Sequence, residues 1–147
     1  MRYLWMGATA CALLCLTAAA SAQSATCTLT VRVDGFRNQK GKLDVNVFKT
    51  PEGWPEQNDK AFFNAGFPIA GKESSAQLSL PPGRYAIVVL HDENSNHKLD
   101  RNFLGIPREG FGFANNPRVL LSPPGFDTAV TVVACPATDV RIHLIYK

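Results

Sequence analysis

Residues 76–90, AQLSLPPGRYAIVVL, contain the pattern that decides the fold class of this chain. Up to Leu80, apolar residues alternate with polar ones, as in a strand that buries one face. The Pro-Pro-Gly sequence that follows turns the chain, because Pro and Gly are strong turn formers. The next run, Tyr85–Leu90, is apolar on both faces, which is typical of a central strand. Two strands joined by a tight turn indicate a β-protein.

Alternation with a period of two recurs in four other segments, at residues 29–33, 43–47, 130–134 and 140–146. Short polar turns bound these segments, and no stretch has the period of an amphipathic helix. We expect an all-β fold, an antiparallel β-sandwich of about seven strands with long loops at one end.

The first 22 residues differ in composition from the rest of the chain. Arg2 is their only charge, Leu4–Leu16 is apolar, and Ala20-Ser21-Ala22 has the small-x-small pattern of a cleavage site. The apolar run reaches only about 20 Å, short of the hydrocarbon core of a membrane. We expect a signal peptide at 1–22, a single β-sandwich domain at 23–147 without a transmembrane segment, and a periplasmic or secreted protein.

The charge distribution argues against one class of partner. The chain carries 15 Lys and Arg residues against 12 Asp and Glu residues, a formal net charge of +3, and these charges are scattered along it. Nucleic-acid-binding proteins usually concentrate basic residues into a patch or stripe. We therefore expect no nucleic-acid partner.

Cys27 and Cys135 are the two cysteines outside the predicted signal peptide. An isolated pair in an oxidising compartment is most simply a disulfide. The alternatives are a metal pair or a reactive thiol, and neither cysteine has a Cys or His neighbour at ligand spacing. We predict a Cys27–Cys135 disulfide that holds the first strand close and antiparallel to the segment 130–134.

Two segments lack alternation, residues 50–73 and residues 91–127. Loops of this length are uncommon in compact domains and are usually functional or disordered. Each segment holds four aromatic side chains, which argues against disorder, so we expect the two to pack together and to cap one end of the sandwich. The aromatic rings either bind a ligand or anchor irregular chain to the core. The candidate ligand surface comprises Trp54, His91, Glu109, Phe111, Phe113 and Asn115.

The sequence of residues 92–100, DENSNHKLD, has the donor spacing of a calcium loop. The pattern is incomplete, because His97 stands at the usual Gly position and Phe103 at the position of the bidentate Glu. Glu93 or Glu109 could supply the missing carboxylate. The competing interpretation is an Asx-rich turn without metal. The candidate calcium ligands are Asp92, Asn94, Asn96, Lys98 through its carbonyl, and Asp100, and no other cofactor is expected.

An enzymatic interpretation would use His91 with Asp92 or Glu109, since His91 follows directly on the central strand. No nucleophile elbow, HExxH motif, phosphate loop or Cys/His cluster accompanies it. A histidine at this place is more often a hydrogen-bonding turn residue, and His143 fits a solvated sheet surface. We therefore expect no catalytic residue.

Three blocks of the chain, at residues 80–89, 91–100 and 105–116, occur in an order and spacing that resemble the signature of an uncharacterised family of exported bacterial proteins, domain of unknown function 2141. The resemblance covers essentially the whole mature chain. The family usually has Gly where this chain has His97. The Pro-Pro-Gly-x-Tyr turn also resembles transthyretin-like and carboxypeptidase-regulatory sandwiches, which implies only a transthyretin-like or immunoglobulin-like fold.

The family name carries no activity, so the function is inferred from the loops. We expect a non-enzymatic exported protein that binds a ligand or a cell-envelope partner through residues 50–73 and 91–127, with calcium ordering residues 92–100. The alternatives are a hydrolase-type enzyme that uses His91, and a purely structural domain. A structural domain predicts no pocket and no cluster of exposed aromatic side chains at the loops.

Overall fold

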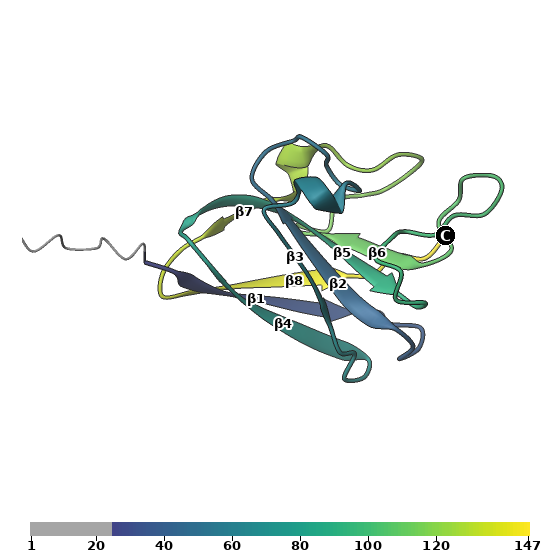
Figure 1. The fold of residues 1–147 in the computed structure, drawn as a ribbon, viewed down its shortest axis with the longest axis horizontal. Coiled ribbons are helices and arrows are strands. Elements are labelled where there is room, and N and C mark those ends of the chain that lie inside the picture. The colour runs from purple at the N-terminus through teal and green to yellow at the C-terminus, as the bar shows by residue number, and fades with distance from the viewer. Residues whose placement is uncertain (1–24) are drawn as a thin grey trace, which may run out of the picture.

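A computed structural model describes residues 25–147, and the predicted signal peptide lies outside these residues. The described chain is all β apart from two single turns of 3-10 helix, and its strands form two sheets that face each other (Figure 1). One sheet has the order β4-β1-β8, and the other has the order β3-β2-β5-β6, with β7 also pairing with β5. The elements are β1 (Cys27–Asp34), β2 (Lys42–Phe48), η1 (Asn58–Lys60), β3 (Phe63–Phe67), β4 (Glu73–Leu80), β5 (Gly83–Asp92), β6 (Gly110–Phe113), η2 (Phe126–Ala129), β7 (Val130–Val133) and β8 (Ala137–His143).

The predicted all-β sandwich of about seven strands is confirmed, and it differs from the prediction in the direction of one strand. It has eight strands because β3 and β6 lie inside the two long segments, where glycines interrupt the alternation. It is not wholly antiparallel, because β8 pairs in parallel with β1, with Val140 opposite Val31. The chain passes from β7 in one sheet to β8 in the other between Val133 and Ala137, so β8 is free to run in the same direction as β1.

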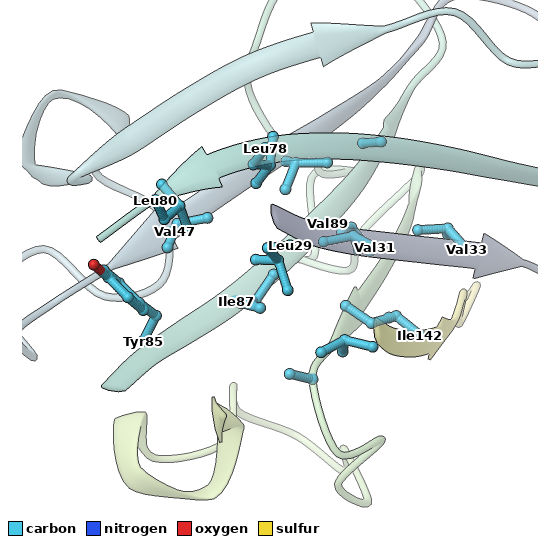
Figure 2. Close-up of a cluster of buried hydrophobic side chains, with 14 of the residues drawn as sticks. Leu29, Val31, Val33, Val47, Leu78, Leu80, Tyr85, Ile87, Val89 and Ile142 are labelled. Atoms are coloured by element: carbon cyan, nitrogen blue, oxygen red, sulfur yellow. The ribbon is translucent and has the colours of Figure 1, made fainter. Parts of the chain in front are cut away.

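The main hydrophobic core lies between the sheets (Figure 2). Alternate residues of β1, from Leu29 to Val33, point toward Ile87 and Val89 of β5, and all are fully buried. Tyr85 is also buried, and its hydroxyl donates a hydrogen bond of 2.8 Å to the carbonyl of Pro81, which holds the Pro-Pro-Gly turn. The period of two in the sequence thus identifies the core face of β1 correctly, and β5 is buried on both faces, as its apolar run predicts.

A second hydrophobic cluster covers the outer face of the five-stranded sheet. Trp54 is its centre, with ring centroids 5.4 Å from Phe48, 5.7 Å from Phe113 and 5.9 Å from Phe126. The two long segments therefore pack together as predicted, but on the face of the sheet instead of at one end of the sandwich (Figure 1). The reason is that β5 is apolar on both faces, so both must be covered.

The Cys27–Cys135 disulfide is present, with the two Cα atoms 4.7 Å apart. Cys27 begins β1, and Cys135 lies in the crossover between β7 and β8. The bridge therefore ties the two sheets together. The strands β1 and β7 are close, as expected, but they lie in opposite sheets and do not pair. Within residues 25–147, no helix has the length and apolar character needed to cross a membrane.

Removing the disulfide should destabilise the fold. In a Cys27→Ser/Cys135→Ser variant of the mature chain, the free energy of unfolding should fall by about 2 to 4 kcal/mol, because the unfolded chain regains loop entropy. Urea unfolding followed by circular dichroism measures this change. Wild-type protein in reductant should match the variant, and equal midpoints with and without reductant would contradict the prediction.

Candidate functional site

A cleft of about 490 Å³ opens on the outer face of the five-stranded sheet. Its floor consists of outward-facing side chains of β5 and β6, namely Val88, Leu90, Phe111 and Phe113. One wall is the segment 97–107, and the other is the segment 119–123. The long segments therefore frame a concave apolar site of the size that small-molecule ligands occupy.

The wall at residues 101–107 is a compact loop that its own hydrogen bonds hold in shape. The side-chain oxygen of Asn102 accepts hydrogen bonds from the backbone N–H groups of Leu104 at 2.9 Å and Ile106 at 3.0 Å. Gly105 has φ of +78°, a conformation that favours glycine and closes the turn. The loop thereby holds Leu104 and Ile106 over the cleft.

Large apolar side chains stand in solvent on both lips of the cleft. Leu104 on one wall is 68% exposed, and Leu120 on the other is 64% exposed, while Leu121 is fully exposed. All three line the cleft. A soluble monomer rarely gathers exposed apolar residues in this way without an interaction that covers them.

Charged groups at the cleft are mainly basic. Lys98, Arg101 and Lys147 line it, whereas Glu56 is the acidic residue among its lining side chains. Arg101 forms an ion pair with Glu56. The ammonium of Lys147 donates to the backbone carbonyl of Val119 at 2.9 Å and so fixes the second wall. Lys98 has no ion-pair partner among residues 25–147.

The residues predicted as a ligand surface are only partly brought together. Phe111 and Phe113 line the cleft. Trp54 lies in the aromatic cluster behind Phe113, where its indole N–H donates to the carbonyl of Pro124 at 2.9 Å. Asn115 has a structural role, because its side-chain amide donates to the backbone carbonyls of two residues near η2. His91 and Glu109 also lie away from the cleft.

His91 is fully buried, and hydrogen bonds occupy both of its ring nitrogens. The carbonyl of Lys40 lies 2.8 Å from Nε2 and can only accept, so Nε2 carries the proton. Nδ1 then accepts a hydrogen bond of 2.7 Å from the hydroxyl of Tyr146. Burial raises the pKa of Tyr146, so that hydroxyl remains protonated. His91 thus joins the C-terminal segment to the turn between β1 and β2.

Glu109 is a buried carboxylate that closes the loop after β5. One oxygen accepts the backbone N–H of Glu93 at 2.9 Å, and the other accepts that of Asp100 at 3.0 Å. Glu93 also pairs with Arg37 at 2.6 Å. Burial alone would raise the pKa of Glu93, but the hydrogen bonds from Arg37 and Asn38 outweigh it and lower that pKa.

The predicted calcium ligands gather into one hydrogen-bonded loop. The buried carboxylate of Asp92 accepts the N–H groups of Asn96 at 3.1 Å and His97 at 2.7 Å. The carboxylate of Asp100 accepts the side-chain amides of Asn94 at 2.7 Å and Asn96 at 3.1 Å. The N–H of Lys98 donates to the side-chain oxygen of Asn96 at 2.9 Å. The loop therefore has the geometry of an Asx-rich turn, in which side-chain oxygens accept backbone N–H groups and the amide nitrogens of Asn94 and Asn96 face Asp100.

Two polar residues on the outer face of β2, Asp44 and Asn46, are buried, although the alternating pattern predicts that they are exposed. Asp44 is only 3% exposed and Asn46 only 5%, because the segment around His97 covers them. Nδ1 of His97 lies 2.8 Å from Oδ2 of Asp44. Burial raises the pKa of Asp44 more than the hydrogen bond from His97 lowers it. The expectation of a half-buried strand is therefore wrong for β2, which is covered on both faces.

Comparison with known proteins identifies a family but no activity. Residues 31–141 match a family described as uncharacterized protein conserved in bacteria (DUF2141). The chain belongs to this family. No curated protein and no solved structure matches it. The match agrees with the resemblance seen in the sequence, and it does not extend to transthyretin-like or carboxypeptidase-regulatory sandwiches.

For this DUF2141 protein, sequence reasoning missed most of the cleft walls. Single leucines and isoleucines in irregular segments carry no periodic signal, so nothing indicated that residues 104–106 and 119–121 face each other. The one available signal was the density of large apolar residues between polar turns, as in RVLLSP at 118–123. One sequence feature indicates that Asp44 is buried. Phe48 lies on the same face of β2, and a large apolar side chain there is expected to be covered by other residues.

The closing role of Glu109 can be measured by substitution. Glu109→Ala leaves two backbone N–H groups without their acceptor, at a cost of about 1 to 3 kcal/mol each when they stay buried. Glu109→Gln keeps one acceptor oxygen and should lose about half as much. Chemical denaturation measures the loss, and hydrogen exchange at Glu93 and Asp100 should accelerate. The control is Glu52→Ala, an exposed residue paired with Lys60, and an equal loss in both alanine variants would contradict the assignment.

Proposed function

We propose that this protein is an exported, non-enzymatic binding protein that holds an amphipathic small molecule with an acidic head group in the cleft. The observation that carries the proposal is the apolar cleft between the walls 97–107 and 119–123, with exposed leucines on both lips. The candidate partner is thus a ligand held by the loops, in preference to an envelope protein, because the site is concave and small.

The apolar part of the ligand follows from the floor and the lips. Val88, Leu90, Phe111 and Phe113 present a continuous hydrocarbon surface. An alkyl chain lying on this surface would also cover Leu104 and Leu120, which now face water. Burial of apolar area contributes about 25 cal/mol per Å², so covering these side chains favours binding.

The acidic head group follows from the charges at the rim. Lys98, Arg101 and Lys147 outnumber Glu56, so the cleft attracts an anion. Arg101 and Lys147 already bind protein groups, whereas Lys98 is available to a carboxylate or phosphate. A hydrolase that uses His91 is disfavoured, because His91 is buried and both ring nitrogens are engaged. Export is supported by the signal-like segment 1–22 and by the disulfide.

Ligand binding can be measured with a dansyl-labelled undecanoic acid and the mature chain. Trp54 is the only tryptophan outside the signal-like segment, and it packs against Phe113 in the cleft floor. A bound dansyl group should therefore emit when Trp54 is excited, with a Kd in the micromolar range. Unlabelled dodecanoic acid should displace the probe at least about tenfold better than dodecanol, because only the acid carries the charge.

The lips supply matched variants for this assay. Leu104→Asp and Leu120→Asp should each weaken binding about tenfold or more. Phe103→Asp is the control, because Phe103 is 95% exposed on the same loop and does not line the cleft. Absence of sensitised emission up to about 100 µM probe, or an equal loss in Phe103→Asp, would refute the proposal.

We also propose that calcium orders residues 92–100. The support is the alternate spacing of Asp92, Asn94, Asn96 and Asp100 in one hydrogen-bonded loop, where their side-chain oxygens keep lone pairs beyond those used in the loop. Calcium added to chelator-treated protein should raise its melting temperature, with a Kd of about 10⁻⁴ to 10⁻³ M. Asp100→Asn should abolish the shift, and an unchanged melting temperature at about 10 mM calcium would exclude the site.

A further inference from the structure

We propose that Asp44, Asp92 and His97 form a binding site for a divalent transition metal, with zinc as the ion that suits these donors best. Asp44 and Asp92 lie on the outer face of neighbouring strands β2 and β5, and His97 reaches over them from the following loop. One donor atom from each residue lies within 4.8 Å of the other two. This site is distinct from the oxygen-lined loop at 92–100, although both include Asp92.

The spacing of the donors suits a small ion. Nδ1 of His97 lies 2.8 Å from Oδ2 of Asp44 and 4.0 Å from Oδ2 of Asp92. Zinc bonds of about 2.0 to 2.2 Å place neighbouring donors about 3 to 3.5 Å apart. The close pair of His97 and Asp44 would widen slightly, and the wider pairs, up to 4.8 Å apart, would close by about 1 Å. A neutral imidazole with its proton on Nε2 leaves Nδ1 available to bind the metal. The side chain of His97 is 57% exposed, so Nε2 can face solvent.

An unsatisfied buried atom points to a missing ligand. Oδ1 of Asp44 is buried and has no hydrogen-bond partner among residues 25–147. A buried carboxylate oxygen without a partner is costly, and folded proteins rarely keep one without a reason. A metal ion bound by both oxygens of Asp44 would satisfy it. The imidazole of His97 does not, since it contacts only Oδ2.

The sheet leaves room beside this atom. Gly66 of β3 pairs with Asp44, and a Cβ at Gly66 would lie only 2.8 Å from Oδ1 of Asp44. The absence of a side chain there therefore keeps space free at the carboxylate. A small cavity of about 270 Å³ adjoins it, and is lined by Asp44, Asn46, Asn58, Asn64, Ala65, Gly66 and His97. Water and an ion can reach the site through this cavity, which supplies the remaining coordination positions.

The donor chemistry favours zinc over calcium at this place. Two carboxylates beside one neutral imidazole carry a charge that a divalent cation balances. Calcium takes oxygen donors almost exclusively, whereas an imidazole nitrogen combined with carboxylates suits zinc and similar ions. Because His97 supplies a nitrogen donor, the site of Asp44, Asp92 and His97 favours zinc, whereas the loop 92–100 favours calcium.

The test uses the chelator-treated mature chain and zinc chloride in isothermal titration. Wild-type protein should bind one zinc ion per chain with a Kd below about 10 µM and should gain thermal stability from it. Asp44→Asn and His97→Asn should each weaken zinc binding about tenfold or more. Both keep the shape of the site, and Asn tolerates the left-handed backbone of residue 97, where φ is +59°.

Controls separate this site from the calcium loop and from binding to other histidines. Asp100→Asn should keep zinc binding within about twofold of wild type and lose only the calcium response. His143 forms an exposed pair with Asp34, and His143→Gln should change neither zinc binding nor the calcium response. In a nitrogen NMR spectrum of the imidazole rings, zinc should shift Nδ1 of His97 and leave His91 and His143 unchanged. Equal zinc affinity in wild type, Asp44→Asn and His97→Asn, or no binding up to about 1 mM zinc, would overturn the proposal.

Discussion

Strand β5 carries apolar side chains on both faces, and neither face can be left in water. Each buried Val, Leu or Ile contributes about 1.5 to 3 kcal/mol, so leaving one face of β5 uncovered would forfeit several of these contributions. One face packs against the three-stranded sheet through Ile87 and Val89. The other face of β5 must also be shielded from water. Residues 25–147 form no third sheet that could cover it, and the two long segments cover it instead. Their length and aromatic content follow from this requirement.

The cover is incomplete, and the incomplete part is the candidate site. Around Trp54 the segments close tightly over the sheet through aromatic contacts. Toward Leu90 and Phe111 two parts of the segment 91–127 stand apart and leave the cleft between them. Over Asp44 they close again, but on a polar surface whose carboxylate is only half satisfied. The same outer face thus changes from a packed core to an apolar cleft and then to a small polar cavity.

The sequence predicts the sheets of this fold much better than the site. A period of two identifies the core faces of β1, β4 and β8, because water on one side and core on the other impose that period. The disulfide follows from the count of cysteines outside the signal-like segment. The outer face of β2 was wrongly predicted to be exposed. Alternation indicates which side of a strand faces the other sheet. It does not indicate that a loop distant in sequence covers the polar side. For the same reason, the loops could be named as the place of function while the cleft walls within them could not.

Strand β5 pairs with three neighbours, β2, β6 and β7, and its two faces have different roles. Its odd-numbered positions, such as Ile87 and Val89, belong to the core, whereas its even-numbered positions, such as Val88 and Leu90, form the floor of the cleft. Successive residues of this strand therefore contact different parts of the molecule. Substitutions at every second residue change the floor of the cleft without touching the side chains between the sheets. A single strand can in this way support a fixed architecture and a variable binding surface at once.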